Sequence, residues 1–119
     1  MKQASLVHLS IDELVNLFRQ NATEQDRVIF KEQVSKYEEV FRESDTITAE
    51  LQKRGPGALR ALMRLYDDPN MQVRLQAARL TVGIAPAEAQ GVLKNIARFG
   101  HVPQSANARA KLRSLGVEW

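Results

Sequence analysis

Hydrophobic and polar positions near the start of the chain follow the period of an α-helix. Ser10 and Glu13 have the Ser-x-x-Glu spacing of a capping box, in which each side chain can bond to the other residue's backbone N–H. Apolar residues then recur at the spacing of one helical face: Ile11, Leu14, Val15 and Phe18. The pattern predicts a helix that begins after Ser10 and buries this face.

A second apolar stripe runs through residues 24–53, among many charges of both signs. Its regular part steps by four, three and four residues, and two further positions extend it: Phe30, Val34, Tyr37 and Phe41, then Ile47 and Leu51. Because this stretch contains no proline or glycine, we expect one long helix, with a kink or short break near residues 21–25. Its charges are expected to form a solvated face, and a two-stranded coiled coil is the alternative reading.

Glycine and proline then divide the rest of the chain at regular intervals. Gly55 can take the left-handed conformation after a helix, and Pro56 suits the first turn of the next helix. Residues 67–70, Asp-Asp-Pro-Asn, predict a turn in which Asn70 is the N-cap of the following helix.

Three helices are expected after this turn, over residues 71–85, over 86–100 and over 105–115. Pro86 would open the second of them. The whole sequence therefore predicts an all-α protein of about six helices with no strand.

The C-terminal half also repeats itself weakly, at offsets of 30 and 35 residues. The first offset lays one set of positions over another: Pro56, Leu62, Met63 and Tyr66 over Pro86, Val92, Leu93 and Ile96. The second does the same: Val73, Arg74 and Leu80 over Ala108, Arg109 and Leu115. Two helix pairs of 30 to 35 residues fit these offsets. Such a pair must stack on a neighbour to bury its apolar face, which is the principle of an α-solenoid.

The helix after the Asp-Asp-Pro-Asn turn is expected to turn one face towards this stack. Its inward positions are Val73, Ala77 and Leu80. Ala77 and Ala78 are small enough to let neighbouring helices approach closely. Arg74 lies beside this seam and can reach carbonyls or acids of the preceding turn, with Asp67 and Asp68 as the nearest candidates.

The run DDPNMQVRLQAARL, residues 67–80, resembles the second-helix signature of HEAT and armadillo-type repeats. Residues 8–115 also resemble a family of short bacterial proteins known only as a domain of unknown function. The positions that carry these resemblances are Lys53, Arg54, Gly55, Pro56, Asp68, Asn70, Val73, Arg74, Ala77, Ala78 and Pro86. The resemblance implies a short right-handed α-α superhelix, with long N-terminal helices over 1–54 and HEAT-like pairs over 55–116. It implies no catalytic residues. Ala108 stands where the repeat has valine, so the pairing of the last two helices stays open.

Composition narrows the functional classes further. The 119 residues, 44% of them hydrophobic, suit one domain, and the absence of cysteine excludes disulfides, thiolate nucleophiles and zinc sites with sulfur ligands. Without a secretory core or 18 consecutive apolar residues, a cytoplasmic protein with no membrane contact is expected. Charge is uneven, since residues 1–55 carry a net −2 and residues 56–119 a net +5. The C-terminal half could therefore favour an anionic partner.

Candidate catalytic and metal-binding groups lack the partners that such chemistry requires. His8 precedes the first helix and His101 lies in a Gly-Pro loop, so both are expected at the surface rather than beside a nucleophile. The acids of the 67–70 turn lack the glycine and terminal glutamate of a calcium loop, and we interpret them as capping residues. We expect no enzyme, no metal and no cofactor.

Basic side chains four residues apart form three pairs that could line a cationic face: Arg60 and Arg64, Lys94 and Arg98, Arg109 and Arg113. The leading hypothesis is a non-catalytic module that binds another protein. A nucleic-acid-binding protein that uses the basic face is the first alternative. An immunity or antitoxin-type partner of a toxin is the second, by analogy alone. An enzyme with carboxylates in an unrecognised cleft is the third.

Overall fold

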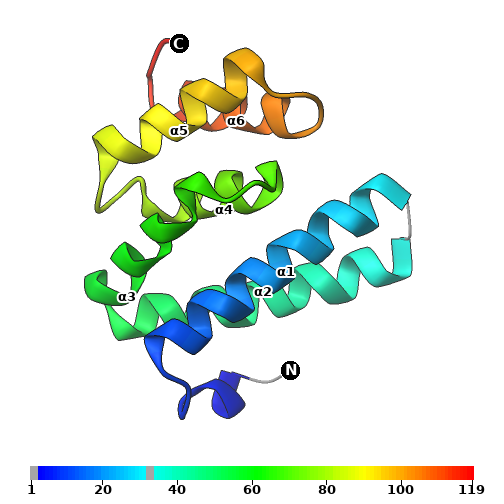
Figure 1. The fold of residues 1–119 in the computed structure, drawn as a ribbon, viewed down its shortest axis with the longest axis vertical. Helices are drawn as coiled ribbons and strands as arrows, with labels where there is room; N and C mark the ends of the chain where they lie inside the picture. Colours follow the sequence, from blue (N-terminus) through cyan, green and yellow to red (C-terminus); the bar gives the residue numbers. More distant parts are fainter. Residues whose placement is uncertain (1–2, 32–33) are drawn as a thin grey trace. The chain divides into compact units, whose positions relative to one another are not determined.

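The computed structural model describes residues 3–31 and 34–119, which contain six α-helices, two short 3-10 helices and no strand (Figure 1). The all-α prediction is therefore confirmed for this part of the chain. Contacts group the chain into two units, Met1–Ala61 and Leu62–Trp119. Unit 1 contains η1 (Gln3–Leu6), α1 (Ile11–Lys31), α2 (Val34–Arg54) and α3 (Pro56–Ala61). Unit 2 contains η2 (Leu62–Asp67), α4 (Met71–Thr81), α5 (Pro86–Phe99) and α6 (Gln104–Ser114).

The capping box at the start of α1 forms as expected. The Ser10 N–H donates to Glu13 Oε1 and the Glu13 N–H donates to Ser10 Oγ, both over 3.0 Å. Leu14, Val15 and Phe18 are buried, whereas Ile11 in the first turn is 37% exposed. The predicted face is thus buried only from the second turn onward.

The break in the long helical region lies elsewhere than predicted. α1 runs unbroken through residues 21–25 to Lys31, and α2 begins at Val34 and packs beside α1 as a hairpin (Figure 1). Buried polar groups hold the two helices together, because Asn21 Nδ2 donates to the Val40 carbonyl over 2.9 Å. Gln25 Nε2 in turn donates to Asn21 Oδ1 over 2.8 Å. These amides join the helices where the sequence suggested an interruption.

The single apolar stripe proposed for residues 24–53 is also wrong in its first half. Phe30 is 86% exposed and Tyr37 is 44% exposed, with the Tyr37 ring stacked on Phe41 at 4.5 Å between centroids. The chain starts a new helix between Phe30 and Tyr37, so their spacing does not place them on one face. The Val34 side chain lies outside the described residues. Ile47 and Leu51, farther along α2, are buried as expected.

The turn between α2 and α3 follows the sequence closely. Gly55 has φ +93°, in the left-handed region that favours glycine, and Pro56 is the first residue of α3. α3 contacts α1 and α2 and belongs to unit 1, so the boundary after Ala61 differs from the expected division after residue 54. Whether the whole chain is one domain stays a prediction.

Unit 2 is organised around α4. Asn70 is its N-cap, accepting through Oδ1 from the N–H groups of Gln72 (2.9 Å) and Val73 (3.2 Å). α4 packs against η2, α5 and α6, and α5 packs along α6 (Figure 1). The core of the unit consists of Leu75, Ala78, Ala89, Leu93, Ile96, Ala97, Ala108 and Leu112. Val73 and Ala77 are also fully buried, and Leu80 is half-buried.

The repeat at an offset of 30 residues holds for the helix starts but not for burial. Pro56 and Pro86 both begin helices. Met63 is half-buried, however, whereas its equivalent Leu93 is fully buried. The reason is that α3 ends at Ala61 and continues as a 3-10 helix, which turns 120° per residue rather than 100° and therefore points the later side chains elsewhere.

Candidate functional site

An open groove of about 550 Å³ lies within unit 2, between η2, the start of α4 and one face of α5. Its lining residues are Met63, Tyr66, Asp67, Arg74, Glu88, Gly91, Val92 and Asn95. We call it the η2–α5 groove. It combines half-buried apolar groups with two carboxylates, one guanidinium and one amide. A hollow of this size and mixed lining suits a few side chains of a partner or a small ligand.

Hydrogen bonds hold the η2 and α4 walls of the groove in place. The Tyr66 hydroxyl bonds to Thr81 Oγ1, which also donates to the Ala77 carbonyl over 2.8 Å. Arg74 Nη1 donates to the backbone carbonyls of Asp68 (2.7 Å) and Pro69 (3.1 Å). The expected contact of this arginine with the preceding turn is confirmed. The groove is therefore bordered by side chains that are already fixed before anything binds.

The opposite wall is a stripe along α5 that consists of Glu88, Gly91, Val92 and Asn95. Their spacing of three, one and three residues places them on one helical face. Gly91 is exposed in the middle of the helix, and a Cβ atom built there would meet no heavy atom within 4 Å. Packing within the described chain therefore does not require glycine. A helical glycine costs about 1 kcal/mol relative to alanine, so this position is left small at the expense of helix stability.

The charges of the groove are anionic apart from Arg74. Burial raises the pKa of the Tyr66 phenol above its ordinary value, the hydrogen bond between Tyr66 and Thr81 opposes this, and the nearby Glu88 carboxylate raises the pKa further. The phenol is accordingly neutral at physiological pH. Asp67 and Glu88 are both exposed, and within the described residues neither carboxylate forms an ion pair or hydrogen bond.

The predicted basic pairs fall in different surroundings. Arg60 lies on α3 in unit 1 and Arg64 on η2 in unit 2, so this pair does not share one α-helix as expected. Both side chains are exposed. Lys94 is half-buried and Arg98 is exposed, four residues apart on α5.

The last basic pair, on α6, makes contacts within unit 2. Arg109 donates from Nε (3.2 Å) and Nη2 (3.0 Å) to the Ala97 carbonyl of α5. Arg74, its counterpart at the predicted offset of 35 residues, also donates to backbone carbonyls, but these belong to the turn directly before its own helix. The Arg113 guanidinium lies 6.0 Å from the Trp119 ring centroid. Arg109 thus has a role in packing α6 against α5.

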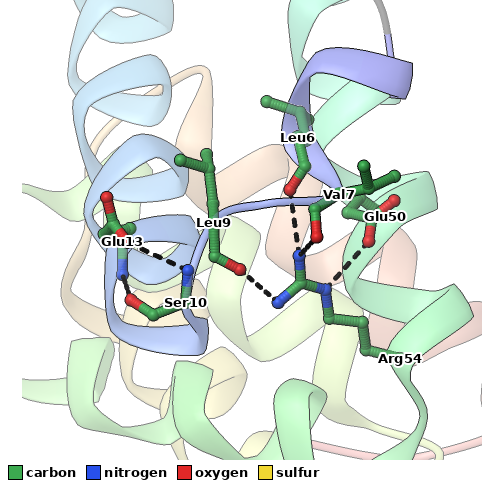
Figure 2. A network of polar contacts seen from close by, with 7 residues as sticks. All are labelled: Leu6, Val7, Leu9, Ser10, Glu13, Glu50 and Arg54. Carbon is green, nitrogen blue, oxygen red and sulfur yellow. Dashed lines mark hydrogen bonds and ion pairs between the residues drawn. The ribbon is translucent and has the colours of Figure 1, made fainter.

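Unit 1 contains a polar network around Arg54, at the end of α2 (Figure 2). Its guanidinium donates to the carbonyls of Leu6 (2.9 Å), Val7 (3.2 Å) and Leu9, and to Glu50 Oε2 over 2.8 Å. Glu50 is 3% exposed, and the Arg54 hydrogen bond holds the pKa of its carboxyl below the ordinary value, against the effect of burial. The network fixes the segment that leads into α1, and we interpret it as structural.

Catalytic and metal-binding arrangements are not evident in the described residues. His8 and His101 are exposed, and the His101 Nδ1 atom lies 3.3 Å from the carbonyl oxygen of Val102. No three or more histidine, aspartate or glutamate side chains in residues 3–31 and 34–119 are grouped so that they could hold a metal ion. None of the helices in this part of the chain has the length and apolar character needed to cross a membrane.

The sequence pointed to residues on the η2 and α4 side of the groove but not to those on the α5 side. It singled out Asp67 and Arg74 for the turn that they form, but not Glu88, Gly91 or Asn95. One signal was available, because a glycine inside an otherwise regular helical pattern is costly and asks for a reason. The position of Met63 could not have been predicted, since it depends on the change from α-helix to 3-10 helix after Ala61.

Comparisons with known proteins agree with the architecture. The chain is similar to the protein RPA1889 from Rhodopseudomonas palustris CGA009, whose crystal structure superposes with a TM-score of 0.89 at 36% sequence identity. The match covers 93% of this chain and 92% of that one. No curated protein matches the sequence. Residues 12–116 match the family described as a domain of unknown function, DUF2019, and the chain belongs to this family.

Proposed function

We propose that this chain is a non-catalytic HEAT-like helical-repeat module that binds another protein through the η2–α5 groove. The observation that carries the proposal is Gly91, which leaves the middle of the α5 wall without a side chain although no described atom lies within 4 Å of a Cβ built there. Glycine in such a position allows another backbone to approach closely. The HEAT-like assignment is supported by the α4 signature, since Asn70 caps the helix and Arg74 binds the turn before it.

The rest of the groove has the character of a protein-binding surface. Met63, Tyr66 and Val92 supply an apolar part, and Arg74 and Asn95 supply polar groups. Tyrosine and methionine are enriched at protein interfaces, and an apolar centre with a polar rim is their common arrangement.

The test is affinity capture from the native cell with three versions of the full chain: wild type, Gly91→Leu and Gly57→Leu. Both glycines are exposed, lie in helices and face open space, so the second variant is a matched control outside the groove. We expect a protein that is retained by the wild type and by Gly57→Leu and is lost from Gly91→Leu. Equal recovery on all three versions would mean that the groove is not the binding surface.

A further inference from the structure

We infer that the η2–α5 groove receives a polypeptide segment that carries a lysine or arginine side chain, with Asp67 and Glu88 as its acidic contacts. This inference rests on the proposed function and adds the chemistry of the partner. It follows from where unit 2 places its few acids, from the fixed position of Arg74 and from the open space at Gly91.

Unit 2 is basic as a whole but acidic at the groove. Residues 62–119 contain eight Lys or Arg and four Asp or Glu, a net charge of +4. Two of the four acids, Asp67 and Glu88, line the groove, and Asp68 is the next residue in the adjoining turn. Because opposite charges attract over a few ångströms and salt screens longer distances, a cationic side chain is favoured at this place and not over the rest of the unit.

Arg74 is the one cationic side chain that lines the groove, and it already has hydrogen-bond partners within the protein. Arg74 directs Nη1 to the carbonyls of Asp68 and Pro69 at the turn. The carboxylates of Asp67 and Glu88 make no ion pair with it or with any other described residue. Their acceptor oxygens are therefore available to an incoming ammonium or guanidinium group.

The shape of the groove favours a polypeptide over a free cation. Glu88 and Asn95 stand seven residues apart on one face of α5, which corresponds to about 10 Å along the helix axis. Gly91 and Val92 lie between them and give a low, apolar stretch of helix surface. A segment lying there can place an apolar side chain against Met63 and Val92 while a neighbouring cation reaches an acid.

The probe is a random twelve-residue peptide library displayed on phage and selected on immobilised full-length protein. Selections on the wild type, Gly91→Leu and Gly57→Leu are compared, and peptides lost only on Gly91→Leu are defined as groove-dependent. We expect these peptides to contain more lysine and arginine than the starting library. Circular dichroism of each variant verifies that the helices are retained.

The strongest groove-dependent peptide is then synthesised with a fluorescent label and titrated by anisotropy. Replacing both acids, Asp67→Asn with Glu88→Gln, should weaken binding about two- to tenfold, the range expected for one or two exposed ion pairs. Exchanging the basic residue of the peptide for methionine should weaken binding to the wild type by a similar factor. The same exchange in the peptide should have little effect on binding to the doubly neutralised protein.

The outcomes separate the two proposals. Groove-dependent peptides without an excess of basic residues, or with an affinity that the neutral variant leaves unchanged, would overturn the cationic partner and leave protein binding intact. If no selected peptide distinguishes Gly91→Leu from the wild type, the groove is not a docking site and the proposed function fails with it.

Discussion

Single side chains with several partners fix the segments that precede the helices. Arg54 illustrates this, since one guanidinium satisfies three backbone carbonyls before α1 and the carboxylate of Glu50 (Figure 2). A planar group with five donors can do this, whereas an ammonium group cannot serve the same fork of acceptors. The sequence showed Arg54 only as part of a motif, because the three carbonyls that it binds lie 45 to 48 residues away.

The Glu50 carboxylate should make folding sensitive to acid. Its pKa is lowered in the folded state, so the unfolded chain binds the proton more readily, and stability rises with pH across this interval. The contribution is present above the ordinary glutamate pKa and is lost as the pH falls through the folded value. Thermal unfolding followed by circular dichroism should show the wild type more stable than Glu50→Gln at pH 7.

The same comparison at pH 3 provides the control, because the unfolded chain then binds the Glu50 proton and the stabilisation that comes from ionisation is reduced. We expect the difference between the two melting temperatures to shrink there. A difference that stays constant between pH 7 and pH 3 would show that the neutral amide disturbs packing and that ionisation of Glu50 contributes nothing.

Ala77 shows how a residue's size decides the packing of unit 2. It is fully buried on α4, so Ala77→Leu must push its neighbours apart or strain its own side chain. We expect the free energy of unfolding to fall by roughly 1–3 kcal/mol, measured by chemical denaturation. Ala106→Leu on the exposed face of α6 is the matched control and should change little. An unchanged unfolding midpoint for Ala77→Leu would contradict the burial of this position.

At the scale of elements, helix starts could be predicted from the sequence because local chemistry determines them. Ser10, Pro56, Asn70 and Pro86 all stand at or immediately before the first residue of a helix, as expected. The break between α1 and α2 could not be found in this way, because no glycine or proline marks it. The hairpin that follows the break is instead joined by contacts between residues distant in sequence, such as the buried bond between Asn21 and Val40. Helix propensities describe single residues and therefore contain no information about this contact.

The groove could not be predicted from the sequence for a related reason. The wall formed by η2 arises from a change of helix type within a continuous stretch, and this rotates Met63 and Tyr66 away from the positions that the repeat suggested. The α5 wall was placed on a helix correctly. The exposed face of that helix depends on how η2 and α4 pack. The periodicity of hydrophobic residues does not give this packing.

Gly91 links this open face to the stability of α5. Replacing it by alanine removes the entropic cost of glycine, and the added methyl group meets open space. Gly91→Ala should therefore raise the free energy of unfolding by about 0.4–1 kcal/mol in chemical denaturation. If the variant is less stable than the wild type, the glycine has a structural role and the argument for a binding role is lost.

At the scale of the whole molecule, charge distribution separates the two binding hypotheses. Residues 62–119 carry a net +4, but Arg74 and Arg109 are engaged with backbone carbonyls and the groove carries acids. A polyanion would therefore find dispersed cations on this unit and repulsion at its groove. The charge distribution of this surface is accordingly compatible with protein binding and unfavourable for nucleic-acid binding.

The difference can be measured by titrating labelled single- and double-stranded oligonucleotides at 50 and 200 mM salt. A nucleic-acid-binding protein that uses Arg60, Arg64, Lys94 and Arg98 would release counterions, and its affinity would fall by about ten to a thousand times between these conditions. We expect instead no binding tighter than about 10 μM at 200 mM salt, the level of non-specific association. Submicromolar binding at 200 mM salt would overturn protein recognition as the main function, because dispersed charges of this number attract polyanions only weakly.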